Sequence, residues 1–410
     1  MFNNNPSRNS GKVFKFLFLV LFGVVVVSLM GYGGNYLDVG NDPLKLYVKK
    51  VLKIEVPEGY KYQAMSGKGS YIGMIYENRK SGVYKTIICN KDGKKVKEFD
   101  GIKLLEWTEK EDEFLGVERK GGYYIVDITS GTKNGIGLDG SEIFYVKYNV
   151  FRRSIFFVRE KEPLRVYEYD IKSGKIRLIY ENKVDGKDNV FDEDLYCMEP
   201  YPVSKDELLW CGELKKNGEL KKNNETNIIV YSVSIKNKKN RIILKSENNT
   251  CEWVNYYLLY GEKIRVVLYT EGYITVFDKY GREQFKVFDR IWDDEDRGIR
   301  TIDQLDYNYL ALSPNGKILA ISNIAFNRDV VASDGIYKTE NIKLADIVLA
   351  NKNDKDKVME LLPPGTNYEK HLRNDVNYEL VKEWSPSGDR IIYLDAKDNR
   401  YYIMKIGVKR

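Results

Sequence analysis

Short runs of alternating apolar and polar residues make up most of the chain after residue 60, and turns that contain glycine separate them. Strands with one buried face show this alternation. A clear example surrounds the turn Trp384–Gly388 (Trp-Ser-Pro-Ser-Gly), in which Pro386 presets φ and the glycine supplies a permissive position. The β-rich run Arg390–Leu394 follows. Because long helical periodicity is absent after residue 60, the pattern predicts an all-β protein.

The strand–turn–strand unit recurs along the chain. A second copy with the same order of residue types occupies Leu312–Ile321, and polar turns with a glycine close further strand pairs at 90–94, 127–131, 170–175 and 278–282. Adding the preceding strand pair to each turn gives seven four-stranded units, which start near residues 62, 104, 145, 200, 254, 306 and 379. Such a series predicts a β-propeller with seven blades, or with six or eight if one degenerate unit is misread.

The two ends of the chain indicate how the ring closes. The last unit ends one strand short, after residues 401–406, whereas a surplus strand alternates at Leu52, Ile54 and Val56. We therefore expect residues 51–56 to pair as the outer strand of the last blade, within a propeller that spans 51–410. Closure removes an exposed strand edge, which would favour aggregation.

The N-terminal segment has a different composition. Residues 1–15 are polar and basic, and residues 16–37 carry no charged side chain. About 20 helical residues cross the hydrocarbon core of a bilayer. Since cations precede this run and Asp38 follows it, the positive-inside rule predicts a cytoplasmic tail, a single transmembrane anchor and, after a linker at 38–50, an extracytoplasmic propeller. A cleaved signal peptide is the alternative, although no Ala-x-Ala site follows the apolar run.

The turn sequences resemble those of the TolB-like, WD-like β-propeller repeat family, in which a Trp-Ser-Pro-Asp-Gly-type turn joins the first two strands of a unit. The matching segments are Trp384–Gly388 and, without the tryptophan, Leu312–Gly316; Trp107–Asp112 keeps only the tryptophan. The resemblance implies the propeller fold. It does not imply one activity, because the family includes binding modules and the non-catalytic propellers of peptidases. The chain between the apolar run and the first unit is too short for the α/β domain of TolB itself.

The long segments between predicted strands fall in one class of connection. They are 181–196, 212–227, 289–302, 325–341 and 363–377, and all join a second strand to a third or one unit to the next. Insertions on one face of a repeat fold commonly mark its binding surface, and drift on an unconstrained face is the alternative. The predicted binding residues for a protein partner are Trp292, Asp293, Asp294, Asp296, Arg297, Tyr368, His371 and Arg373.

Few residues with catalytic potential occur in a recognisable pattern. The one histidine, His371, has no Gly-x-Ser-x-Gly elbow to accompany it, and zinc sites with several histidines are excluded by number. The acidic run at 293–296 lacks the spacing of an EF-hand loop. The sequence therefore assigns no catalytic residue, metal or cofactor. A carboxylate-based hydrolase in the central funnel remains the alternative function, and inward-facing Asp or Glu clusters would favour it.

Charge and cysteine content limit the remaining classes. The net charge is +6, without a concentrated basic stripe, which disfavours a nucleic-acid partner. Of the four cysteines, Cys89 and Cys211 lie in strand-like runs and are expected to be small buried apolar residues. A disulfide between Cys197 and Cys211 is the alternative for that pair outside the cytoplasm.

Overall fold

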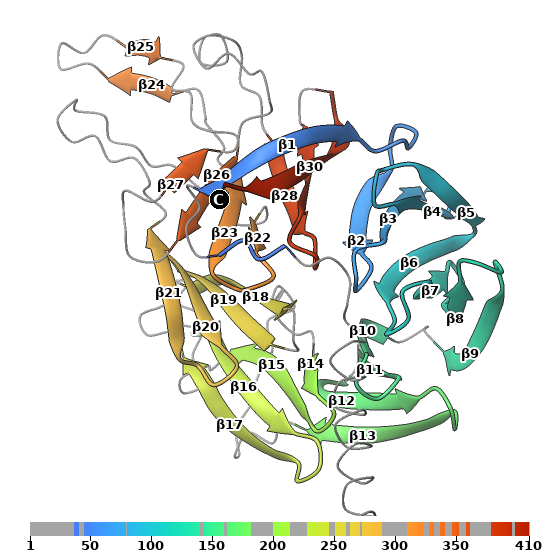
Figure 1. Cartoon of the computed structure of the whole chain (residues 1–410). Helices are drawn as coiled ribbons and strands as arrows, with labels where there is room; N and C mark the ends of the chain where they lie inside the picture. The colour runs from blue at the N-terminus through green and yellow to red at the C-terminus, as the bar shows by residue number, and fades with distance from the viewer. Residues whose placement is uncertain are drawn as a thin grey trace, which may run out of the picture.

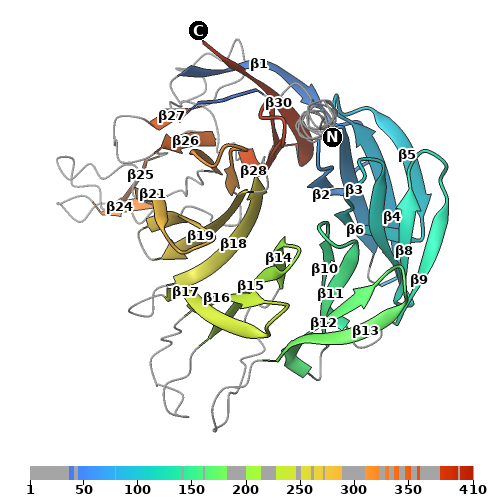
Figure 2. The ribbon, with the colours of Figure 1, turned by 60° about the horizontal axis from the view of Figure 1, so that its bottom comes forward.

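Antiparallel sheets repeat along the chain and stand side by side around a central axis (Figures 1 and 2). The computed structural model describes residues 37–40, 45–78, 80–139, 143–159, 162–181, 200–213, 228–245, 251–259, 263–270, 273–288, 310–322, 328–331, 337–340, 347–351, 358–360, 379–395 and 398–409. Seven four-stranded sheets and one two-stranded sheet form within these residues. The predicted all-β propeller fold is confirmed.

The first three sheets follow the chain without interruption. Sheet 1 contains β2 (Lys61–Met65), β3 (Tyr71–Asn78), β4 (Val83–Asn90) and β5 (Lys95–Asp100). Sheet 2 contains β6 (Ile102–Trp107), β7 (Glu113–Glu118), β8 (Gly122–Asp127) and β9 (Lys133–Asp139). Sheet 3 contains β10 (Ile143–Asn149), β11 (Ser154–Arg159), β12 (Glu162–Asp170) and β13 (Lys175–Glu181).

The remaining sheets contain the longer connections and the closure of the ring. Sheet 4 contains β14 (Tyr201–Ser204), β15 (Glu207–Glu213), β16 (Ile228–Ser234) and β17 (Lys239–Lys245). Sheet 5 contains β18 (Cys251–Leu259), β19 (Lys263–Thr270), β20 (Tyr273–Asp278) and β21 (Glu283–Phe288). Sheet 6 contains β22 (Leu310–Leu312), β23 (Ile318–Ser322), β26 (Ile347–Asn351) and β27 (Val358–Glu360), and sheet 7 contains β28 (Glu379–Trp384), β29 (Arg390–Asp395), β30 (Arg400–Val408) and β1 (Leu46–Lys53).

A buried hydroxyl organises the turn between the first two strands of several sheets. In the turn of sheet 7, Ser385 N donates to Arg390 O (2.8 Å) and Arg390 N donates back to Ser385 Oγ (3.1 Å). Ser313 makes the same two bonds with Ile318 in sheet 6. Ser66 does so in sheet 1, where the turn has no proline and was not recognised in the sequence. The hydroxyl satisfies a buried backbone donor that a shorter side chain would leave unpaired.

The turns between the third and fourth strands of a sheet depend on a side-chain acceptor and a glycine. Asp170 Oδ1 accepts a hydrogen bond from Ser173 N (2.7 Å), and Gly174 has φ +67°. Asp278 Oδ1 likewise accepts from Tyr280 N (2.8 Å), and Gly281 has φ +80°. These Asx turns occur where the sequence predicted polar turns with a glycine.

The core lies between neighbouring sheets rather than within any one of them. The junction of sheets 7 and 1 buries Ile54, Met74, Ile87 and Ile403 in one cluster. Corresponding clusters join sheets 1 and 2, 2 and 3, and 3 and 4. Each four-stranded sheet therefore has its apolar faces covered only when the neighbouring sheets are present.

The ring closes through a strand contributed by the N-terminal part of the chain. β1 pairs antiparallel with β30, in a register that runs from Leu46 opposite Val408 to Lys53 opposite Tyr402. We expected this strand at 51–56, and that boundary was wrong: residues 46–50, assigned to a linker, are already strand. A register shift between Val48 and Lys50 breaks the alternation there and hid the start of the strand.

The apolar alternation at 52–56 has another cause. Ile54 is fully buried against sheet 1, in the cluster that also contains Leu52 and Val56 at its margin. Glu55 N donates to Gly93 O (2.8 Å), so the chain has passed from sheet 7 to sheet 1 by this point.

Residues 37–40, ahead of β1, bridge two sheets. Leu37 N donates to Ser387 O (2.7 Å) in the turn of sheet 7, and Asn315 Nδ2 in the turn of sheet 6 donates to Gly40 O (2.5 Å). Between them, Val39 is 1% exposed and packs in the cluster shared by the two sheets. Residues 38–40 are therefore part of the packed structure and not a linker. The rest of the predicted membrane anchor, 16–36, lies outside the described residues. Among the residues that the structure describes, no helix is long and apolar enough to cross a membrane.

Removal of β1 should open the ring. We expect deletion of residues 1–53 to lower the melting temperature by more than about 5 °C relative to deletion of 1–36, because it exposes the β30 edge and the pocket of the fully buried Leu46. Thermal unfolding followed by circular dichroism measures this difference. Equal melting temperatures for the two truncations would show that β1 does not close the ring.

Gly388 should be more sensitive to substitution than its φ alone requires. It has φ +80°, and an added Cβ would collide with the carbonyl oxygen of Leu37. Gly101, with φ +75° and nothing within 4 Å of an added Cβ, is a matched control. We expect Gly388→Ala to cost at least about 1 kcal/mol more in unfolding free energy than Gly101→Ala. The excess should vanish when residues 1–40 are deleted; an excess that persisted would mean that Leu37 is not its cause.

Candidate functional site

The two faces of the ring carry different kinds of connection. We call the side with the first-to-second and third-to-fourth strand turns the turn face, and the side with the second-to-third connections and the links between sheets the loop face. The longest connection on the turn face is 352–357, with six residues. The connections longer than ten residues all lie on the loop face: 182–200, 214–227, 289–309, 323–346 and 361–378. The strand order thus places the long segments on one face, as the sequence predicted.

The predicted binding side chains belong to two of these segments. Trp292, Asp293, Asp294, Asp296 and Arg297 fall between β21 and β22, and Tyr368, His371 and Arg373 fall between β27 and β28. All eight lie outside the described residues. They stay predictions, and only the strands that flank them are placed.

One loop-face segment contains a sheet of its own. Within 323–346, which we expected to be a loop, β24 (Arg328–Val331) pairs antiparallel with β25 (Tyr337–Glu340). Figures 1 and 2 show this hairpin outside the ring, beyond β26 and β27. In the described structure the two strands pair only with each other. A two-stranded ribbon presents backbone donors and acceptors along its outer edges, which an extended peptide could extend into a sheet.

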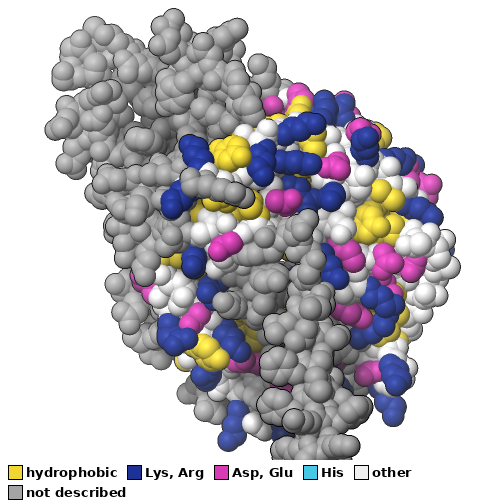
Figure 3. Space-filling model, viewed as in Figure 1, with side chains coloured by type: hydrophobic (Ala, Val, Ile, Leu, Met, Phe, Trp, Pro, Cys, Tyr) yellow, Lys and Arg dark blue, Asp and Glu magenta, His cyan; other side chains and the backbone are white. Residues whose placement is uncertain are grey.

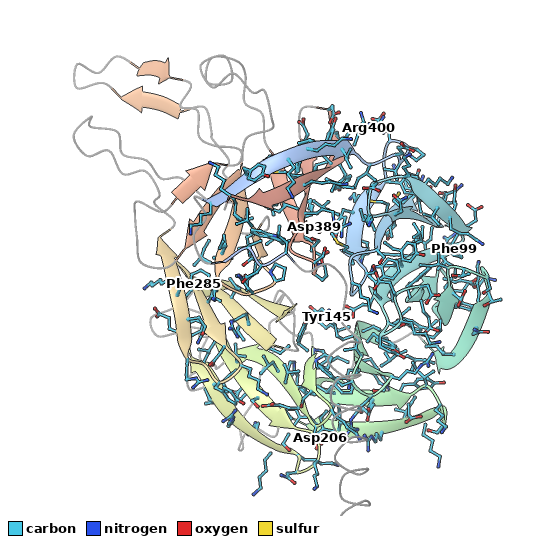
Figure 4. All side chains as sticks on the ribbon, in the orientation of Figure 1. Phe99, Tyr145, Asp206, Phe285, Asp389 and Arg400 are labelled. Atoms are coloured by element: carbon cyan, nitrogen blue, oxygen red, sulfur yellow. The ribbon has the colours of Figure 1, made fainter. Side chains whose placement is uncertain are left out.

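The first strand of each sheet is nearest the axis. Figure 4 shows Tyr145, on β10, and Asp389, in the β28–β29 turn, near the centre of the ring, whereas Phe99 on β5 and Phe285 on β21 lie farther out. Any chemistry in the central funnel must therefore come from the first strands and their turns.

A carboxylate on the first strand of sheet 7 joins the last sheet to the first. Glu383 Oε2 accepts hydrogen bonds from Met65 N (3.0 Å) and from the hydroxyl of Tyr62, both on β2. Burial raises the pKa of Glu383 to about 7, although both hydrogen bonds lower it. Burial and the neighbouring carboxylate also raise the pKa of Tyr62 well above its usual value, so the phenol remains a donor.

An equivalent carboxylate occurs in sheet 2. Glu106 accepts hydrogen bonds from Lys147 Nζ (2.5 Å) and Tyr148 N (3.3 Å), both on β10 of sheet 3. Glu106 and Glu383 each immediately precede a tryptophan at the end of a first strand. Each also accepts a hydrogen bond from a backbone N–H of the next sheet along the ring. Neither glutamate was predicted as a functional residue, but the repeated Glu-Trp pair was a signal in the sequence that could have identified both.

The two carboxylates lie at different junctions of the ring. Glycosidases need two carboxyl groups about 5 to 9.5 Å apart across one substrate bond. Glu383 lies at the junction of sheets 7 and 1 and Glu106 at the junction of sheets 2 and 3, so sheet 1 and its junction with sheet 2 lie between them. Within the described ranges no three His, Cys, Asp or Glu side chains are grouped to hold a metal ion. The two glutamates act as links between sheets.

A shallow groove of about 550 Å³ lies at the outer rim between sheets 3 and 4. Its lining residues are Leu178, Tyr180, Glu181, Lys238, Lys239 and Asn240. The amide of Asn240 donates to the hydroxyl of Tyr180 across it. The mixed charges of the lining indicate no particular ligand.

The cysteines contribute no reactive group that the structure places. Cys89 is a free, fully buried thiol, and burial raises its pKa to about 12. The prediction that it is a small buried residue is confirmed. The predicted alternative of a Cys197–Cys211 disulfide is untested, because Cys197 and the side chain of Cys211 lie outside what the structure describes.

Comparison with known proteins identifies a fold and no family. No family model matches the chain, and no curated protein sequence matches it. Among solved structures, an oligogalacturonate lyase in complex with manganese is similar over 89% of this chain and 91% of that one, with 10% identity and a TM-score of 0.51. The WD40 repeats of RRP9 are similar over 88% and 98%, with 8% identity and a TM-score of 0.50. At these identities the likeness concerns the fold alone.

Glu383 should make the stability of the ring depend on pH. Its pKa in the folded chain, about 7, lies above the ordinary carboxyl value, so its contribution is fully present at acid pH and is lost as pH rises through about 7. Glu383→Gln keeps an acceptor for Met65 N but cannot ionise. We expect the melting temperature of this variant to rise relative to wild type between pH 5 and pH 8. Parallel pH profiles for the two proteins would show that Glu383 is not the titrating group.

Proposed function

We propose that the chain is a membrane-anchored, extracytoplasmic β-propeller of the TolB-like type that binds a protein partner through its loop face. In this proposal all seven four-stranded sheets are blades of one ring, residues 16–37 form the anchor, and residues 1–15 remain in the cytoplasm. The partner is a protein, since the chain has no basic stripe suited to nucleic acid.

The observation that carries the proposal is the placement of the long connections. All connections of more than ten residues lie on the loop face, while turn-face connections keep to six residues or fewer. In repeat folds, insertions collected on one face commonly form the binding surface, held in position by the rigid sheets beneath. The β24–β25 hairpin adds an ordered backbone edge to that face, which suits recognition of an extended peptide.

The described inner strands give less support to the hydrolase alternative. A general acid with a pKa near neutrality is what such an enzyme would use, and Glu383 has that property. However, its carboxylate is engaged by Tyr62 and Met65, and the equivalent Glu106 lies at another junction. The fold does not decide between the two functions, because both a lyase and a WD40-repeat protein share it.

The test compares partner capture from detergent-solubilised membranes. The variant replaces 289–302 and 363–377 by short Gly-Ser linkers, and the control carries Lys68→Ser and Lys236→Ser on the turn face. We expect the loop variant to lose at least about 90% of a partner that the full chain and the control retain. The reason is that the variant lacks the main contacts, and each tenfold loss of affinity corresponds to about 1.4 kcal/mol of binding free energy. Mass spectrometry identifies the partner, and binding of the purified pair is then measured.

Two results would contradict the proposal. Retention of every partner by the loop variant would place the binding surface elsewhere. Recovery of no partner by the full chain would favour the hydrolase, which a substrate screen would then examine.

A further inference from the structure

The end of the predicted membrane anchor coincides with a fixed point on the turn face. Leu37, the last residue of the uncharged run, donates its N–H to Ser387 O (2.7 Å). Gly40 O accepts from Asn315 Nδ2 (2.5 Å), and Val39 is buried between the same two turns. These turns join first to second strands, so both belong to the turn face. Leu37 is thus both the last residue of the predicted anchor and part of the packed turn face.

This attachment limits how far the propeller can stand from the membrane. An extended chain spans at most about 3.3 to 3.6 Å per residue. Since the last apolar residue is itself bonded to the turn of sheet 7, the turn face must lie within a few residues' reach of the point where the anchor leaves the bilayer.

The turn face is suited to phosphate groups. Exposed lysines occur in its turns on four sheets: Lys68, Lys91, Lys94, Lys172, Lys236 and Lys317. Two acidic residues in other turns of this face are paired. Glu111 accepts from Lys68 N and Ser70 N, each at 2.7 Å, and Asp206 pairs with Arg152 at 2.8 Å. The six lysines project from this face, and the carboxylate of Glu111 is directed toward backbone donors of the neighbouring turn.

Cations on β17 and in the β20–β21 turn surround an exposed tyrosine, and two of them are paired, Lys279 with Glu207 and Arg282 with Asp278. The ring of Tyr280, which is 51% exposed, has Arg241, Lys279 and Arg282 within 6 Å of its centroid. Tyrosine and lysine or arginine together are typical of surfaces at the headgroup level of a membrane. Figure 3 shows Lys and Arg interspersed with Asp and Glu over the described surface that it presents.

We infer that the turn face rests on the phospholipid headgroups of the membrane in which the chain is anchored, and that the loop face points away from the bilayer. The inference rests on the proposed membrane anchor. It adds an orientation and a second interaction surface: the turn face contacts lipid phosphates, and the opposite face is presented to a partner.

The test uses the full chain in phospholipid vesicles that contain a fluorescent phospholipid. A photo-crosslinking phenylalanine derivative replaces either Lys68 or Lys236 on the turn face, or Lys80 or Lys120 on the loop face; all four lysines are exposed. Flotation of the vesicles first isolates inserted protein. We expect lipid crosslinks several-fold more abundant from the two turn-face positions than from the two loop-face positions.

The outcomes separate the inference from its premise. Equal crosslinking from both faces, or stronger crosslinking from Lys80 and Lys120, in protein that floats with the vesicles would overturn the orientation and leave the anchor standing. Failure of the chain to float would refute the anchor itself, and the orientation with it.

Discussion

The pairing of β1 with β30 is the constraint on which the rest of the structure depends. Each four-stranded sheet has two apolar faces, and these are covered only by the sheets on either side. The last sheet obtains its outer strand from residues 46–53, and the next residues of the same segment, led by Ile54, fill the junction with sheet 1. One stretch of chain thus completes a sheet and seals the closing junction. Glu383 reinforces that junction from the first strand, through Tyr62 and Met65.

The sequence predicted those parts of the fold that depend on local chemistry. The turn at Ser385 and the Asx turns at Asp170 and Asp278 follow from residues within five positions of each other, and their glycines have the positive φ that the pattern implied. What it missed depends on distant partners. The start of β1 is disguised by the shift at Val48 and Lys50, because the ladder there is defined by β30, more than 350 residues away. The β24–β25 hairpin was missed as well, although Asp334 and Gly335 lie between its strands in the sequence.

The same distinction between local patterns and distant partners applies to the candidate site. Glu383 bonds to residues 318 and 321 positions away, and no local pattern reports such a contact. The repeated Glu-Trp pair was visible, yet its meaning appears only when both glutamates are seen to bind a backbone N–H of a neighbouring first strand. The distribution of insertions could be predicted, and the turns explain it physically. Glu111 and Arg390 bind turn-face segments of neighbouring sheets, so an insertion in those turns would break hydrogen bonds between sheets.

The closure also determines on which face the N-terminal segment emerges. β30 runs from the loop face to the turn face, because it follows the β29–β30 connection and ends beside the β28–β29 turn, where Ile406 N bonds to Asp389 O. A strand antiparallel to it must run the opposite way, so the chain ahead of β1 necessarily approaches from the turn face. Because the chain approaches from the turn face, Leu37 and Gly40 contact the turns of sheets 7 and 6. An N-terminal anchor on a propeller closed in this manner leaves the loop face, with its long connections, on the side away from the anchor.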